Sequence, residues 1–281
     1  MRWRGGRRSG NIEDRRGMAP VAGGIGVGGV VLALTGYFVF GISPQDTLSV
    51  VNSAGAPAQA VGERGIPDDE GGQFVDVIET SSADVWTQVF AERGQRYEPP
   101  AAVVLYDQAT GTGCGSGQAA MGPFYCPADR KVYLDLSFWQ ELSGRFGAEG
   151  EAARAYVIAH EIGHHVQNLT GQMRRVDAMG RQGAESGAVR LELQADCYAG
   201  VWAARADEVS GGAVALGPDD IAQGLGAAAA VGDDTLQRQS RGRVVPDAFT
   251  HGSSEQRMRW FRVGAETGDP QACDTFSAGR L

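Results

Sequence analysis

The chain of 281 residues contains a single lysine, Lys131, and four histidines. Its formal charge of −9 is unevenly distributed: residues 1–20 carry six arginines against two acidic residues, a charge of +4, so the remainder carries −13 (−9 − 4). No basic stripe follows residue 20. Nucleic-acid binding needs clustered lysine and arginine to neutralise phosphates, so the composition argues against a nucleic-acid partner.

Charge is absent altogether from residues 21–42, a stretch of 22 residues reading VAGGIGVGGVVLALTGYFVFGI. As a helix this length matches the hydrocarbon thickness of a bilayer. The six preceding arginines place residues 1–20 in the cytoplasm and everything after residue 42 outside the cell membrane. We therefore predict a single-pass anchor in contact with membrane lipid. A cleaved signal peptide is the competing interpretation, and a buried soluble helix is disfavoured by the one-sided charge.

The residues after the anchor divide into a linker and a domain. Residues 43–72 are rich in alanine, glycine, proline and acidic groups and predict a flexible linker. Residues 73–281 predict one α+β domain, in which a small sheet precedes several helices. Apolar periodicity predicts strands at 101–106 and 131–136 and helices at 74–93, 137–146, 149–169, 185–209, 218–239 and 254–267.

The glycine-rich stretch 110–117 lacks the Gly-Lys-Ser/Thr ending of a phosphate loop, so we expect a flexible loop pinned by Cys114. Four cysteines in an exported domain predict two disulfides. Of three possible pairings, the short-range Cys114–Cys126 is the first choice, which leaves Cys197 with Cys273. Four unpaired buried thiols are the alternative for a cytosolic domain.

Three of the four histidines lie in the sequence HEIGHH at 160–165. On a helix, His160 and His164 project from one face and can bind one cation. Glu161 then lies beside the metal, where a carboxylate can take a proton from a metal-activated water. His165 points away from the pair and is expected to be a packing or surface residue. The pattern predicts a catalytic Zn²⁺ site.

Such a site needs a third protein ligand. The elongated motif with a third histidine fails, because Gln167 and Thr170 occupy its glycine and histidine positions. The segment RLELQADCYAG at 190–200 supplies Glu192 and Asp196, which share one face of an apolar helix. We expect Glu192 to be the third ligand and Asp196 to accept a hydrogen bond from His160. A solvated helix face is the alternative.

The set HEIGH…ELQAD resembles the gluzincin metallopeptidases. Together with residues 113–139 it more narrowly resembles a bacterial family of neutral zinc metallopeptidases, over about residues 74–276. The resemblance implies a zincin-like fold with His160, His164 and Glu192 as the metal ligands. It also implies Asp196 as the hydrogen-bond partner behind them and Glu161 as the general base. It says little about the substrate beyond a peptide or protein.

Thermolysin-like enzymes in that group add a histidine or tyrosine that stabilises the oxyanion. His251, in THGSSEQR at 250–257, is the remaining histidine, and this stretch resembles the Thr-His-Pro…Arg sequence of membrane-associated prenyl proteases, with Gly252 in place of proline. His251 is thus predicted either to stabilise the oxyanion or to cap the helix beginning near Ser253. Arg257 is a weaker candidate for the oxyanion or for substrate.

The sequence therefore predicts a membrane-anchored zinc endopeptidase, with residues 131–136 as a strand that pairs with extended substrate. Two other classes stay open. A non-peptidase zinc amidohydrolase of the peptide deformylase kind would use Cys114 as the third ligand. An envelope scaffold would hold a structural zinc, which is normally closed by four protein ligands.

Overall fold

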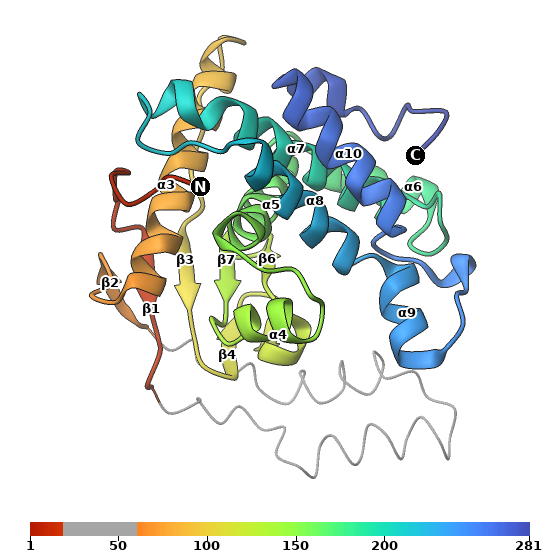
Figure 1. Ribbon diagram of the computed structural model, residues 1–281, viewed down its shortest axis with the longest axis horizontal. Coiled ribbons are helices and arrows are strands. Elements are labelled where there is room, and N and C mark those ends of the chain that lie inside the picture. Colours follow the sequence, from red (N-terminus) through yellow and green to blue (C-terminus); the bar gives the residue numbers. More distant parts are fainter. Residues whose placement is uncertain (19–60) are drawn as a thin grey trace.

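A computed structural model describes residues 1–18 and 61–281 of the chain (Figure 1). The strands are β1 (Ile12–Asp14), β2 (Glu63–Gly65), β3 (Ala102–Leu105), β4 (Ala109–Thr112), β5 (Gly115–Gln118), β6 (Phe124–Cys126) and β7 (Lys131–Leu134). The α-helices are α3 (Glu70–Ala91), α4 (Phe138–Gly144), α5 (Glu151–Leu169), α6 (Val176–Met179), α7 (Gly187–Val209), α8 (Pro218–Ala230), α9 (Asp233–Arg241) and α10 (Ser254–Thr267). The small sheet and the following helices form the α+β fold that the sequence predicts.

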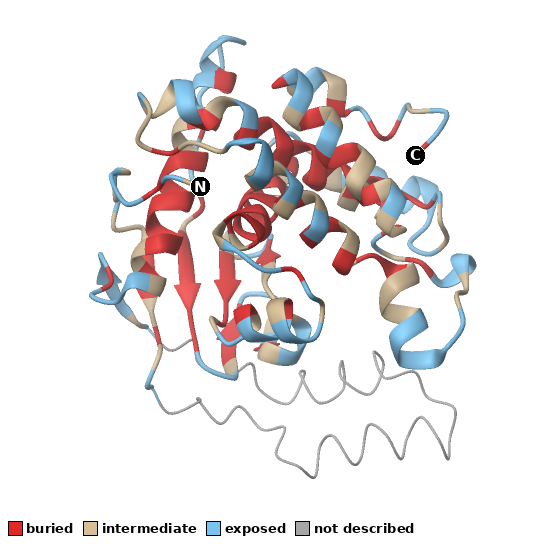
Figure 2. Ribbon diagram, in the orientation of Figure 1, coloured by how far each residue is buried: buried red, intermediate tan, exposed pale blue. Residues whose placement is uncertain are grey.

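Five strands form one mixed sheet in the order β2-β1-β3-β7-β6. Strand β3 is parallel to both of its neighbours, whereas β2 and β6 pair antiparallel at the two edges. Because side chains alternate along a strand, Val103 and Leu105 join the main core under the helices, while Val104 and Tyr106 belong to a second cluster. The helices thus lie on one face, and Figure 2 shows their inner sides buried.

Three of the helices, α3, α7 and α10, begin where a side chain caps the first free N–H groups. Asp69 accepts a hydrogen bond from the Gly72 N–H at the start of α3, and Ser186 accepts one from Val189 at the start of α7. Ser253 and Gln256 form a reciprocal capping box on α10. The capping alternative for His251 is therefore wrong, because Ser253 fills that position.

The N-terminal residues are part of the folded domain, which differs from the expectation of a separate basic segment. Strand β1 lies between β2 and β3, and Trp3 is buried against Phe74 with ring centroids 5.0 Å apart. Within the linker predicted at 43–72, the part after residue 60 contributes β2 and the start of α3. Sequence periodicity missed β1 because three residues with two charges carry no strand pattern of their own.

The helix predicted at 218–239 is two helices, α8 and α9, separated at Val231 and Gly232. A Cβ atom on Gly232 would lie 2.4 Å from the Ser254 backbone nitrogen, so the chain passes this point only with glycine. Directly afterwards, the Asp233 carboxylate accepts hydrogen bonds from the backbone N–H groups of residues 250–252. The break is a tertiary contact, which helical periodicity does not record.

The predicted glycine-rich loop is instead the hairpin β4–β5. The disulfide Cys114–Cys126 joins its turn to β6, and Cys197–Cys273 joins α7 to the C-terminal segment. The preferred cysteine pairing is thereby confirmed.

The predicted membrane segment, residues 21–42, lies outside the described residues. Within residues 1–18 and 61–281, no helix combines the length and apolar character needed to span a bilayer.

Candidate metal centre

Helices α5 and α7 cross at unusually close range, and the crossing point is Gly163. A Cβ atom at this position would lie 3.1 Å from the Ala195 carbonyl oxygen and 3.2 Å from its Cα. Since van der Waals packing normally keeps carbons 3.5–4.0 Å apart, only glycine permits this approach without displacement. It brings the 160–164 face of α5 against the 192–196 face of α7.

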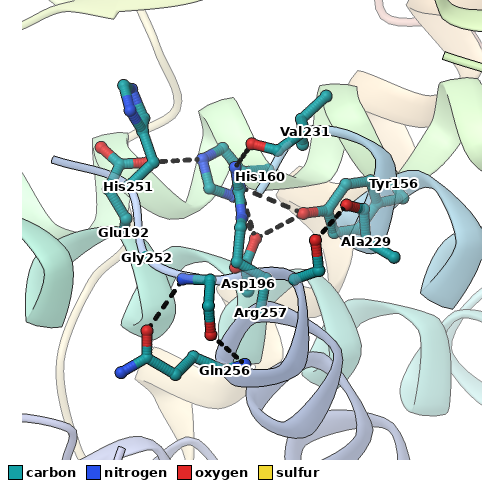
Figure 3. Close-up of polar contacts among 12 residues, drawn as sticks. Tyr156, His160, Glu192, Asp196, Ala229, Val231, His251, Gly252, Gln256 and Arg257 are labelled. Carbon is teal, nitrogen blue, oxygen red and sulfur yellow. Dashed lines mark hydrogen bonds and ion pairs between the residues drawn. The ribbon is translucent and has the colours of Figure 1, made fainter. Parts of the chain in front are cut away.

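Helix α10 packs still more closely on another side of α7. A Cβ on Gly264 would lie 1.9 Å from the Cys197 carbonyl oxygen, so the two backbones touch there. This contact places Arg257, on the first turns of α10, beside Asp196 of α7 (Figure 3). Three helices distant in sequence therefore contribute to one site.

His160, His164 and Glu192 each present a ligand atom to a common point, and these atoms lie within 4.8 Å of one another. His160 Nε2 is 3.3 Å from one Glu192 oxygen, and His164 Nε2 is 3.5 Å from the other. Among residues 1–18 and 61–281 this is the one group of three or more such side chains close enough to share a cation. Two imidazoles and a carboxylate are a ligand set that suits zinc.

Asp196 lies behind His160 and is completely buried. Its Oδ1 is 2.8 Å from His160 Nδ1 and accepts from the Tyr156 hydroxyl at 2.5 Å (Figure 3). Arg257 donates to both carboxylate oxygens at 2.9 Å. A carboxylate on Nδ1 leaves Nε2 to face the metal position.

The charges at the centre favour a bound cation. Burial by itself would lower the pKa of His160, but the Asp196 and Glu192 carboxylates outweigh burial and raise that pKa to about 10. Burial alone would raise the pKa of Glu192, yet the neighbouring histidines, led by His164 and His251, hold it well below its usual value. Without a metal, protonated imidazoles thus balance the charge of the carboxylates, and a divalent ion can take the place of these protons. The donor set and its charge fit zinc.

Glu161 lies beside the three-residue cluster, on the wall of a cleft of about 780 Å³. Burial raises the pKa of its carboxyl group. The cleft wall also contains large apolar side chains: Met121, Phe124, Phe138, Phe146, Met173, Leu191 and Leu236. An apolar cleft with a few convergent polar groups is the usual form of a substrate site.

His251 reaches the same cleft from the loop before α10 (Figure 3). Its side chain is 51% exposed, its Nδ1 contacts the Thr250 hydroxyl at 2.8 Å, and Asp233 lies 3.5 Å away. The Glu192 carboxylate is the main cause of its raised pKa. Arg257 also borders the cleft, but its guanidinium contacts Asp196, Tyr156 and the Val231 carbonyl.

His165 is fully buried, as a packing residue. Its ring nitrogens contact the Tyr125 hydroxyl at 3.0 Å and the Glu98 carbonyl at 2.7 Å, so it joins α5 to β6. Burial lowers its pKa to about 4, which leaves the ring neutral at pH 7.

The prediction that the strand at 131–136 pairs with substrate is wrong. Residues 131–134 form β7, which pairs with β3 on one side and β6 on the other. Both of its edges are therefore occupied. Among the described strands, β6 forms the edge of the sheet beside the cleft, and residues 122–125 line the cleft. Sequence alternation identifies a strand but does not reveal its position in a sheet.

Sequence reasoning treated Gln167 only as a departure from the elongated histidine motif. In the structure Gln167 is fully buried, and its Oε1 lies 2.9 Å from His164 Nδ1. Its position three residues after His164, on the same helix face, was the one available signal.

The amidohydrolase alternative with Cys114 as a ligand is contradicted. Cys114 is bonded to Cys126, so it has no thiolate to offer a metal.

Comparison with known proteins identifies the family that the sequence motifs resemble. Residues 1–276 match the family model described as "Putative neutral zinc metallopeptidase". The "Uncharacterized protein YpfJ" of Escherichia coli (strain K12) is 44% identical over 291 residues, covering 98% of this chain and 99% of the relative. The "Uncharacterized protein Rv2575" of Mycobacterium tuberculosis is 53% identical over 184 residues, covering 63% and 62%. No solved structure matches the chain significantly.

Proposed function

The chain belongs to the neutral zinc metallopeptidase family, and we propose that it is a zinc-dependent endopeptidase with its active centre at the junction of α5 and α7. The observation that carries this proposal is the convergence of His160, His164 and Glu192 on one point, with Glu161 beside them in an apolar cleft. A catalytic zinc site has three protein ligands and one open position.

The chain's own residues would divide the work. A zinc ion held by the three ligands supplies Lewis acidity toward a water molecule and the scissile carbonyl. Glu161 takes a proton from the water and later delivers it to the leaving amine. His251, on the exposed side of the cleft, donates a hydrogen bond to the developing oxyanion. Asp196 keeps His160 oriented throughout.

We further propose that substrate binds as an extended chain along β6. An edge strand offers free backbone donors and acceptors to a peptide. The apolar side chains of the cleft favour a peptide with large apolar residues near the scissile bond. Unfolded protein is therefore the substrate to test first.

The test compares Glu161→Gln with the matched control Glu208→Gln, an exposed residue at the far end of α7. Cleavage of unfolded protein and bound zinc are measured for each. We expect Glu161→Gln to keep one zinc ion and lose activity by orders of magnitude, while the control keeps both. Undiminished cleavage by Glu161→Gln would refute the general-base role. One bound zinc without any cleavage by the unaltered protein would favour the scaffold alternative.

A further inference from the structure

We propose that Gln167 is the positioning residue for the metal ligand His164, and that it is itself held by Gln194 and the C-terminal segment. The inference rests on the metal centre proposed above. Gln167 follows His164 by three residues on α5 and is fully buried. Its Oε1 lies 2.9 Å from His164 Nδ1.

The orientation of this amide is determined by its other end. Gln167 Nε2 donates to the Leu191 carbonyl at 2.7 Å and to Gln194 Oε1 at 3.2 Å. Two acceptors at Nε2 leave Oε1 as the atom facing His164. With a metal bound, His164 must then carry its proton on Nδ1, which leaves the Nε2 lone pair for the metal position that it shares with Glu192. Asp196 acts on His160 in the same way with a charged group, whereas Gln167 is neutral.

The chain of hydrogen bonds from His164 through Gln167 and Gln194 continues to the C-terminal segment. Gln194 Nε2 donates to the Cys273 carbonyl at 3.0 Å, and Cys273 is bonded to Cys197. Arg190 donates to the Thr275 carbonyl from the same face of α7. Residues 190, 194 and 197 therefore hold the C-terminal segment, while residues 192 and 196 face the metal centre. One face of α7 therefore holds the C-terminal segment, and the opposite face contributes to the metal centre.

The experiment measures zinc affinity by chelator competition for Gln167→Met, which keeps side-chain length but neither accepts nor donates strong hydrogen bonds. Thr170→Val is the matched control, because it removes the hydroxyl that donates to the Val166 and Gln167 backbone carbonyls at the end of α5 and leaves the Gln167 side chain in place. Loss of a partner behind a ligand histidine weakens metal binding by roughly 10–100-fold. We expect that loss for Gln167→Met and none for the control. In zinc-loaded protein we also expect the His164 Nδ1–H proton to exchange with solvent faster in Gln167→Met than in the unaltered protein, because its acceptor is gone.

Zinc affinity of Gln167→Met within tenfold of the unaltered protein, or an unchanged exchange rate of the His164 Nδ1–H in zinc-loaded protein, would overturn the inference and leave the peptidase proposal intact. If the unaltered protein binds no zinc, both proposals fail. Should Gln167→Met not fold, Gln194→Met removes the hydrogen bond between Gln167 and Gln194 instead. An unchanged zinc affinity of that variant would equally refute the inference.

A second, independent observation concerns the N-terminal residues. We infer that residues 1–18 and the domain formed by residues 61–281 lie on the same side of any membrane that residues 21–42 enter. Strand β1 occupies an interior position of the sheet, between β2 and β3. Because a strand cannot pair across a bilayer, this arrangement is incompatible with a cytoplasmic N-terminus and an external domain in one molecule.

The N-terminal contacts are extensive and specific. The buried carboxylates of Asp76 and Glu79 on α3 accept hydrogen bonds from the Ser9 backbone N–H and hydroxyl and from the Asn11 side chain. Without residues 1–18 both carboxylates would lose these donors, which is costly for buried charge.

Four of the six arginines that suggested a cytoplasmic N-terminus form ion pairs with the domain. Arg4 pairs with Glu70, Arg7 with Asp84, and Arg16 with Asp69. Arg15 is buried and donates to the Thr110 hydroxyl and the Gly111 carbonyl of the β4 strand. These arginine side chains therefore stabilise the contact between residues 1–18 and the domain, and they do not indicate a membrane surface.

Cysteines introduced at Asp14 and Glu63 test the inference, because these residues face each other across β1 and β2 and flank residues 21–42. Opposite residues of antiparallel strands are close enough for a disulfide. Mild oxidation of intact cells should cross-link Asp14→Cys with Glu63→Cys. It should not cross-link Asp14→Cys with Ser240→Cys on α9, which lies far from β1 (Figure 1). Absence of the first cross-link, and of one between Arg7→Cys and Asp84→Cys, would refute the shared side.

Discussion

Replacement of Gly163 by alanine tests whether the close crossing of α5 and α7 builds the metal centre. The new Cβ would lie 3.1 Å from the Ala195 carbonyl oxygen and 3.2 Å from its Cα. The helices must therefore separate by a few tenths of an ångström. Overpacking of a core costs roughly 1–3 kcal/mol.

A second effect has the opposite sign. Alanine is favoured over glycine inside a helix by about 1 kcal/mol, so the net loss of unfolding free energy should be about 0–2 kcal/mol. Gly226→Ala is the matched control, because Gly226 lies within α8 with no atom within 4 Å of its would-be Cβ. That variant should gain stability of about 0.5–1 kcal/mol.

Urea unfolding of the two variants separates the cost of overpacking from the gain in helix propensity. Chelator competition measures the zinc affinity of the centre. We expect Gly163→Ala to be less stable than Gly226→Ala by about 1–3 kcal/mol and to bind zinc more weakly, because Glu192 moves away from His160 and His164. Equal stabilisation of the two variants with unchanged zinc affinity would show that the contact at Ala195 does not constrain the site.

Three other perturbations have defined outcomes. Asp196→Leu leaves the Arg257 guanidinium buried without its carboxylate, so urea unfolding should show a loss of about 3–5 kcal/mol; the double variant with Arg257→Leu should lose less, and an additive loss would contradict the pairing. Zinc at 100 times its dissociation constant should stabilise the protein by about 2.7 kcal/mol, seen as a melting shift that chelator reverses and that His160→Ala abolishes; an equal shift in that variant would place zinc elsewhere. Burial raises the pKa of Glu79, so its contribution is complete below the usual carboxyl pKa and is lost as pH rises through the folded value. Glu79→Gln should therefore weaken the fall of the melting temperature as pH rises above the usual carboxyl pKa, and parallel curves for the two proteins would refute this.

Long-range pairing decided the features that sequence periodicity missed. Strand β1 has three residues and is stabilised by its pairing with β3 and by the hydrogen bond of the preceding Ser9 to Asp76 of α3. Whether a strand is interior or at an edge is a property of its neighbours, so periodicity could not show that β7 is interior and that β6 lies at the edge. Gln167 likewise acquires its function from Leu191 and Gln194, both on another helix.

What the sequence by itself determined is the local chemistry. The four-residue spacing in HEIGH places two imidazoles on one face because a helix repeats every 3.6 residues, and the same spacing places Glu192 and Asp196 together. Apolar periodicity also located most helices, since burial of one face is a local pattern. Only the tertiary structure decided that these two faces meet, because their approach depends on Gly163 against Ala195 and Gly264 against Cys197, contacts between residues far apart in the chain.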